Sequence, residues 1–251
     1  MVEINLNTIK VNNKIQIRTL DLVWFMVIPL ININYYIAST ITKNGHNLAT
    51  IFDKVMKFNS IFIIPYVYWY VYIVIGFIII LIQSRVNYMR TFLSFFIGMG
   101  ICYCIYYIYP TEIIRPNIEN SNVLNYLVNI IYSADRSVNC FPSLHALTTY
   151  FIMRYTKYEK NKKNFYYTQI VGSLIILSTV FIKQHFVADI IGAMVICEVI
   201  IYFMNKVSED RIKKVLDIPY KIKDKIVANL KSKIKTKAID SDEKKFFSRK
   251  I

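Results

Sequence analysis

The sequence has little of what disulfide-bonded or zinc-binding folds need. Its 251 residues include four cysteines and three histidines. The cysteines form no disulfide framework and no zinc-ligand spacing, because Cys102 and Cys104 would point to different faces of a helix and the other two stand alone. A signal peptide is also not expected. The first apolar run exceeds the usual core of about 7 to 15 residues and lacks a small-residue cleavage site, which indicates a retained helix.

Acidic side chains are scarce as well. There are 16 aspartates and glutamates against 31 lysines and arginines, a net charge of +15. No nucleic-acid recognition motif accompanies this excess, so we expect no nucleic-acid partner. The acidic residues also form no carboxylate cluster of the kind that a metal-dependent phosphotransferase uses. We therefore expect neither a metal nor another cofactor.

Apolar residues, in contrast, make up 55% of the chain, too many for an ordinary soluble domain. Each charge-free window has about the 20 residues that a membrane-spanning helix needs, and these windows are 22–42, 61–82, 91–110 and 164–182. Two less uniform segments, 143–155 and 186–205, complete the set. The sequence thus predicts an all-α protein with a bundle of six transmembrane helices over 21–205, a segment 1–20 before it and a basic tail 206–251 after it.

The basic residues predict the orientation of the bundle. With the N-terminus inside, 25 of the 31 lysines and arginines would lie on the cytoplasmic side. Basic residues are enriched in cytoplasmic loops of membrane proteins. We therefore expect both termini in the cytoplasm. We also expect a multi-pass protein of the plasma membrane whose active site is extracytoplasmic.

The tail from Lys206 alternates lysine with aliphatic residues. Ile222, Ile226 and Leu230 recur every four residues, as one face of a helix does. Two interpretations remain open from this pattern: a solvated basic tail, or a helix that lies on anionic membrane lipids.

Ionisable residues interrupt the apolar pattern at "KQHFVADIIGA", residues 183–193. At membrane depth such groups are costly and usually functional. His185 and Asp189 are four residues apart, so on a helix they share one face, and the carboxylate can accept the second N–H of the imidazole. On the predicted topology, both lie near the extracytoplasmic face.

A second polar stretch, "SADRSVNCFPSLHALTT" (133–149), falls on the same side. Pro142 suits the first turn of a helix. The free amides of Ser143, Leu144 and His145 would then open a helix N-terminus, which is suited to bind an anion. Arg115 would lie nearby, at the end of the third span. Asp135 and Arg136 lie in the connecting loop, and the sequence does not decide whether either of them belongs to the site.

These motifs together resemble those of the type 2 phosphatidic-acid phosphatase family, integral-membrane relatives of vanadium-dependent haloperoxidases. The resemblance rests on "RP" at 115–116, "PSLH" at 142–145 and "SxxxxKQHxxxD" at 178–189. The forms "PSLH" and "KQHxxxD" are similar to a subset that includes the inositolphosphorylceramide synthases.

The resemblance implies a metal-independent enzyme in which a histidine attacks phosphorus. By position, His185 corresponds to the nucleophile, Asp189 to its orienting carboxylate and His145 to the general acid and later base. Arg115 and Ser143 correspond to phosphate ligands, and Leu144 would contribute its amide. The expected activity is hydrolysis of a membrane lipid phosphate or diphosphate at the extracytoplasmic face through a phosphohistidine.

Three positions depart from the family pattern. Ile108 stands where the first motif usually has a lysine, and Thr179 stands where the third has an arginine. Leu144 replaces the glycine of the usual "PSGH" and crowds the approach. Lys183, two residues before His185, is our candidate for a substitute phosphate ligand.

Other functions remain open on these residues. The same histidine could transfer a phosphorylated head group to a lipid alcohol instead of water. His145, His185 and Asp189 could instead bind a metal. In a non-catalytic transporter, His185 and Asp189 could form a proton relay, although such a relay has no need of Arg115.

Overall fold

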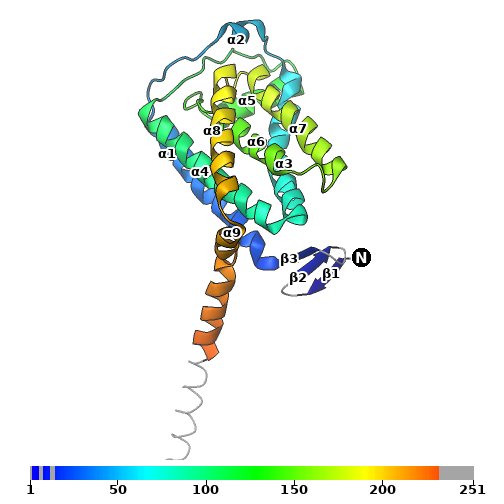
Figure 1. Cartoon of the computed structure of the whole chain (residues 1–251). Coiled ribbons are helices and arrows are strands. Elements are labelled where there is room, and N and C mark those ends of the chain that lie inside the picture. The colour runs from blue at the N-terminus through cyan, green and yellow to red at the C-terminus, as the bar shows by residue number, and fades with distance from the viewer. Residues whose placement is uncertain (1, 6–7, 12–14, 232–251) are drawn as a thin grey trace, which may run out of the picture.

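The computed structural model describes residues 2–5, 8–11 and 15–231. At the N-terminus it has three short antiparallel strands in the order β1-β2-β3, namely β1 (Val2–Asn5), β2 (Thr8–Val11) and β3 (Ile15–Arg18). Alternation of isoleucine with polar residues, as in 15–18, suits a strand. We did not predict this small sheet, which lies beside one end of the helical bundle (Figure 1).

The bundle itself is all-helical, as predicted. Within the described part of the chain, five helical runs are long and apolar enough to cross a membrane, so the chain is a multi-pass membrane protein. These are η1 (Thr19–Met26) with α1 (Val27–Ile41), η2 (Ser60–Phe62) with α3 (Ile63–Gln83), α4 (Arg85–Ile108), α7 (Lys162–Phe181) and α8 (Val187–Lys206). Their positions agree with five of the six predicted spans.

The sixth predicted span is the short helix α6 (Leu144–Tyr155). Twelve residues extend about 18 Å, well short of the roughly 30 Å hydrocarbon core of a membrane. This helix is therefore too short to count among the spans, and it packs instead against α3, α4, α7 and α8. Close approach is possible because Gly76 of α3 faces Ile152 and Gly98 of α4 faces Phe151, with no room for a Cβ atom at Gly76.

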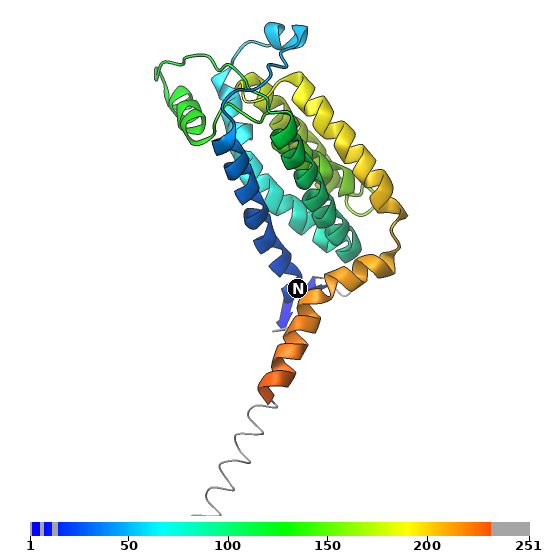
Figure 2. The ribbon, with the colours of Figure 1, turned by 90° about the vertical axis from the view of Figure 1, so that its left-hand side faces the viewer.

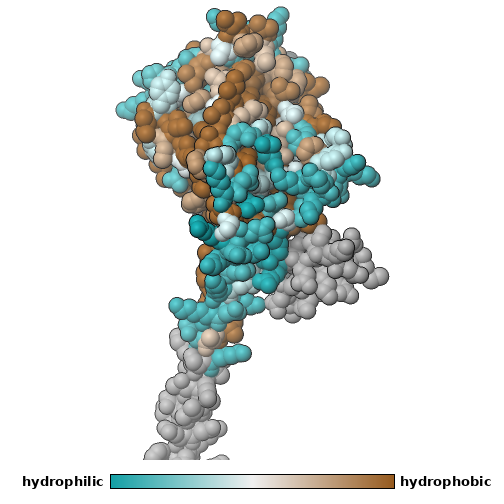
Figure 3. Space-filling model, viewed as in Figure 1, coloured by the Kyte–Doolittle hydropathy of each residue, from teal (hydrophilic) through white to brown (hydrophobic). Residues whose placement is uncertain are grey.

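The connections gather at the two ends of the bundle (Figure 2). The end that carries α2 (Ile51–Val55) and α5 (Val123–Ala134) also holds the loops 109–122, 135–143 and 182–186. The strands β1–β3 and the described part of the tail lie at the opposite end, with the turn at Ser84. Teal polar residues gather at that terminal end, whereas brown apolar residues cover much of the bundle (Figure 3). The described members of the two groups of basic residues thus occupy opposite ends, while the side that faces the cytoplasm stays a prediction.

Ion pairs hold the charged residues of the bundle. Buried Asp21 accepts two hydrogen bonds from Arg85, at 2.7 and 2.8 Å, which join η1 to α4. Glu198, which lies inside a span, pairs with Arg154 at 2.7 Å and accepts a hydrogen bond from Tyr150. Because burial of an unpaired charge is costly, these pairs explain why the spans tolerate them.

The described part of the tail is helical, in α9 (Glu209–Leu216) and again over 218–231. Ile222, Ile226 and Leu230 are all exposed on this second helix. The predicted helical spacing is therefore present, and its contact with lipid stays a prediction. Residues 232–251 of the predicted tail lie outside the described residues.

Candidate active site

His185 is held by two acceptors at the start of α8. Its Nδ1 lies 3.0 Å from the carbonyl oxygen of Cys140 and 3.3 Å from Oδ2 of Asp189. A carbonyl oxygen can only accept a hydrogen bond, so Nδ1 must carry the proton. In neutral His185 the lone pair is then on Nε2. Asp189 itself is fully buried, and its Oδ2 also accepts from the amide of Phe186 at 2.9 Å.

A tight connection between α7 and α8 sets this geometry. The carbonyl oxygen of Thr179 accepts from the amides of both Gln184 and His185, at 2.9 and 3.1 Å. Lys183 has a φ of 54° in the left-handed region, which lets the chain reverse there. Asp53 of α2 accepts from the amide of Val187 at 2.9 Å and so caps the N-terminus of α8.

His145 lies at the N-terminus of α6, and its ring centroid is 5.7 Å from that of His185. It packs against Tyr66 and Trp69 of α3, with ring centroids 4.8 and 4.5 Å away. Ser143 is the N-cap of α6, since its Oγ accepts from the amide of Ala146 at 3.2 Å. Pro142 therefore precedes the cap and does not occupy the first turn, contrary to our prediction.

The amides of Leu144 and His145 donate to no acceptor among the described residues, so they are available to an anion. The amide of Ser143 is not, because it donates to the carbonyl oxygen of Asp189 at 3.1 Å. Of the three amides predicted to open this helix, two are therefore uncommitted.

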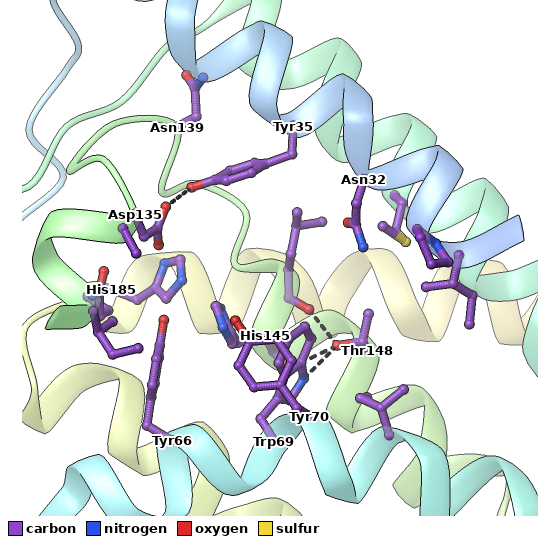
Figure 4. A pocket seen from close by; sticks show the side chains of 18 of the residues that line it. Asn32, Tyr35, Tyr66, Trp69, Tyr70, Asp135, Asn139, His145, Thr148 and His185 are labelled. Carbon is purple, nitrogen blue, oxygen red and sulfur yellow. Dashed lines mark hydrogen bonds between the residues drawn. The ribbon is translucent and has the colours of Figure 1, made fainter. Parts of the chain in front are cut away.

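A cavity of about 630 Å³ extends from the two histidines between α1, α3, α4 and α6 (Figure 4). Most of its lining is apolar or aromatic. The walls include Phe25, Ile28, Tyr35, Tyr66, Trp69, Tyr70, Ile73, Val74, Phe95 and Met99, and Asp135, Arg136 and Gln184 lie at the end with the histidines. Its chemistry suits a ligand with a long apolar part and a polar end.

Arg115 is close to the site but engaged by the backbone. Its Nη1 donates to the carbonyl oxygens of Tyr132 and Asp135, at 3.2 and 2.6 Å, and its Nη2 donates to Oε1 of Gln184. Its guanidinium also lies over the Tyr132 ring, 4.7 Å from the centroid. Among the three guanidinium nitrogen atoms of Arg115, Nε is the one that is buried without a hydrogen-bond partner.

Gln184 is a residue that the sequence analysis missed. Since its Oε1 accepts from Arg115, the side chain is fixed with its Nε2 donor group buried and unpartnered. Gln184 lines the cavity beside His185. Its position between Lys183 and His185 in the motif was the available signal. An uncharged amide, however, is not an obvious phosphate ligand in a sequence that offers a lysine beside it.

Two other predicted phosphate ligands do not line the cavity. The ammonium group of Lys183 donates to the backbone carbonyl oxygens of Asp53 and Met56 in and after α2. Ser143 is fully buried and caps α6. The two replaced family positions are not in the site either: Ile108 is 82% exposed at the end of α4, and the Thr179 hydroxyl donates to Ile176 of its own helix.

For a metal site, three or more ligands would have to converge. Within the described ranges, no such group of histidine, cysteine, aspartate and glutamate side chains is present. His185 and Asp189 are close, but His145 presents its ring to the aromatic wall. The metal-free reaction stays a prediction.

Comparison with known proteins gives a family match for the segment that holds these residues. Residues 114–213 match the family model described as PAP2 superfamily. The matched segment contains Arg115, His145, His185 and Asp189, so the resemblance to phosphatases of this type is confirmed; the narrower likeness to inositolphosphorylceramide synthases stays a prediction. No curated protein and no solved structure matches the chain.

Proposed function

We propose that this chain, whose residues 114–213 match the PAP2 superfamily model, is a membrane phosphatase that cleaves a phosphate ester of a lipid through a covalent phosphohistidine. The observation that carries the proposal is the bonding of His185. With Nδ1 committed to Cys140 and Asp189, the lone pair on Nε2 is free to attack phosphorus.

The reaction needs two proton transfers, and we assign both to His145. In the first step His145 starts as the imidazolium, a charged form that burial disfavours by lowering its pKa and that the anionic substrate must therefore stabilise. Nε2 of His185 forms a bond to phosphorus as the bond to the leaving oxygen breaks, and that oxygen takes a proton from His145, which becomes neutral. In the second step a water attacks the phosphohistidine, gives its proton to His145 and restores neutral His185. The ring separation of 5.7 Å lets both side chains reach atoms on one phosphoryl group.

The oxygens of the phosphoryl group need donors. We assign the uncommitted amides of Leu144 and His145 and the unpartnered Nε2 of Gln184 to them. Arg115 contributes charge nearby and holds Gln184 in position. Ser143 acts through the α6 cap, and Lys183 is left out because its ammonium group faces α2.

The apolar cavity supports a lipid as the substrate, since its walls between α1 and α3 suit acyl chains. We place the site on the extracytoplasmic side of the plasma membrane, because the other end of the bundle has most of the basic residues. Transfer to an alcohol is the second candidate. The scarcity of free cations at the site favours this second candidate. Few cations suit the single negative charge of a phosphodiester, the kind of substrate from which a head group is transferred, better than the double charge of a monoester.

Trapping of the phosphoenzyme tests the two histidine assignments. With a labelled aryl phosphate, whose leaving group needs little protonation, His145→Ala should accumulate acid-labile, alkali-stable phosphoenzyme because the base for water is missing. His185→Ala should form none, since the nucleophile is gone. Label that builds up in His185→Ala would show that the roles are reversed.

A further inference from the structure

The end of the cavity beside His185 carries an acidic side chain that the reaction does not use. Asp135 follows α5 directly and turns toward Tyr35 of α1, whose hydroxyl donates to Oδ1 at 2.5 Å. Oδ2 accepts no hydrogen bond from any described residue. Figure 4 shows Asp135 between Tyr35 and the His185 ring, at the polar end of the cavity.

No cation neutralises this carboxylate by direct contact. Across the ranges that the structure describes, Asp135 forms no ion pair. Its two basic neighbours bind backbone instead: Arg115 donates to carbonyl oxygens of the loop, and Arg136 donates to those of Ser39 and Thr42. A partly buried carboxylate with a free oxygen thus faces the space that the substrate would fill.

That arrangement is unfavourable for a phosphate monoester. Its two negative charges would lie close to Asp135, and among the described cavity-lining residues the one lysine or arginine is Arg136, whose guanidinium is already bound. A phosphodiester has one negative charge. If its head group also carries an ammonium, the ligand is neutral overall and its positive end can meet the carboxylate.

The walls around Asp135 suit such an ammonium. Tyr35, Tyr66, Trp69 and Tyr70 all line the cavity. Aromatic rings attract cations through their negative faces, and aromatic cages are a known way to bind quaternary ammonium groups.

From these observations we infer that Asp135, with the surrounding tyrosines, binds the ammonium of a zwitterionic phospholipid head group whose phosphodiester lies at His185. The inference rests on the proposed function for the position of the phosphate. It deepens that function by naming the substrate class, a choline- or ethanolamine-type phosphodiester lipid.

Binding of three short-chain ligands tests the inference without turnover. Octylphosphocholine, its 3,3-dimethylbutyl analogue and octyl phosphate share one tail, and the first two differ only in nitrogen against carbon. Calorimetric titration of the full chain in maltoside micelles, in the His185→Ala background, avoids cleavage. We expect octylphosphocholine to bind about tenfold more tightly than the uncharged analogue, a difference of 1.4 kcal/mol, and octyl phosphate to bind more weakly than octylphosphocholine.

Asp135→Asn keeps an acceptor for Tyr35 but removes the charge, so the affinity ratio of the first two ligands should fall to about one. Glu112→Gln is the matched control. It removes a carboxylate at the same end of the bundle that accepts from the Gly45 amide and does not line the cavity. In this control the ratio should stay at about ten. Unchanged affinity of Asp135→Asn for the uncharged analogue would show that the cavity is intact.

A ratio near one in the parent protein overturns the inference, even if Asp135→Asn fails to fold. So does a ratio that Asp135→Asn leaves unchanged. Failure of the proposed function gives a different result. Charge-selective binding with no phosphoenzyme in any variant would overturn the proposed phosphatase and leave the ammonium site supported. Phosphoenzyme without charge-selective binding would overturn the ammonium site and leave the phosphatase supported.

Discussion

Asp189→Asn tests how much the charge of the buried carboxylate contributes to the reactivity of His185. Attack by Nε2 leaves a positive charge on the imidazole, 3.3 Å from Oδ2 of Asp189 at its nearest nitrogen. Two unit charges at that separation attract by about 5 kcal/mol at an effective dielectric constant near 20. This value is an upper limit, because the imidazolium charge is spread over the ring. It corresponds to a rate factor between about 10³ and 10⁴.

The structure predicts a smaller loss than this limit. The carbonyl oxygen of Cys140 is nearer to Nδ1 than Asp189 is, at 3.0 Å against 3.3 Å, and it keeps the proton on Nδ1 after the substitution. The wrong tautomer, which costs about 10⁴ where an aspartate alone orients a histidine, is therefore avoided. We expect kcat to fall by about 10² to 10³, with KM changed by less than about threefold.

Steady-state kinetics on the best substrate of a lipid phosphate panel measures this effect. Asp53→Asn is a matched control, because Asp53 also accepts from a backbone amide at the start of α8 but does not contact His185. It should retain kcat within about tenfold. A loss under about tenfold in Asp189→Asn, or equal losses in the two variants, would refute the reasoning.

Three further predictions follow from the same geometry. In a Cys104→Ser background, Asn44→Cys should react with a membrane-impermeant thiol reagent in intact cells. The Cys140 thiol should not react with the reagent, because it is buried and burial raises its pKa. Labelling only after permeabilisation would show that the topology is inverted. Phosphate release should persist in chelator and be inhibited by vanadate, a five-coordinate mimic of the phosphoryl group, whereas loss in chelator with recovery on adding one divalent ion would favour the metal site. Lys183→Gly should retain kcat/KM within about tenfold. Glycine adopts a φ of 54° without strain, and the lysine side chain faces α2. A loss beyond about hundredfold would show that Lys183 reaches the phosphate.

The positions of the helices could be predicted because they depend on apolar length and on charge. That criterion failed at α6 for a physical reason. Its twelve residues are apolar through burial in protein, and sequence composition does not distinguish that environment from lipid. The N-terminal sheet was not predicted, because strands of only four residues carry too short an alternation of apolar and polar residues to stand out from the sequence around them.

The contact of His185 with Asp189 could also be predicted, since the two residues lie one helical turn apart and a local pattern shows this. The partners of the cations could not. Arg115 binds carbonyl oxygens 17 and 20 residues away, and Lys183 binds those of Asp53 and Met56 more than 120 residues earlier. Every residue has a backbone carbonyl oxygen, so the sequence does not show which carbonyl oxygens a cation will bind. Arg115 and Lys183 were therefore both predicted to be phosphate ligands.

The cavity is built from two parts of the chain with different relations to the chemistry. Both histidines and Asp189 lie within 114–213, but the apolar walls come largely from α1, α3 and α4, which precede that segment. On the proposed function, substitutions in those three helices would change which lipid fits and would leave His145, His185 and Asp189 in place. Exchange of α1 and α3 between related proteins would accordingly test whether lipid selectivity can be altered while these three residues stay unchanged.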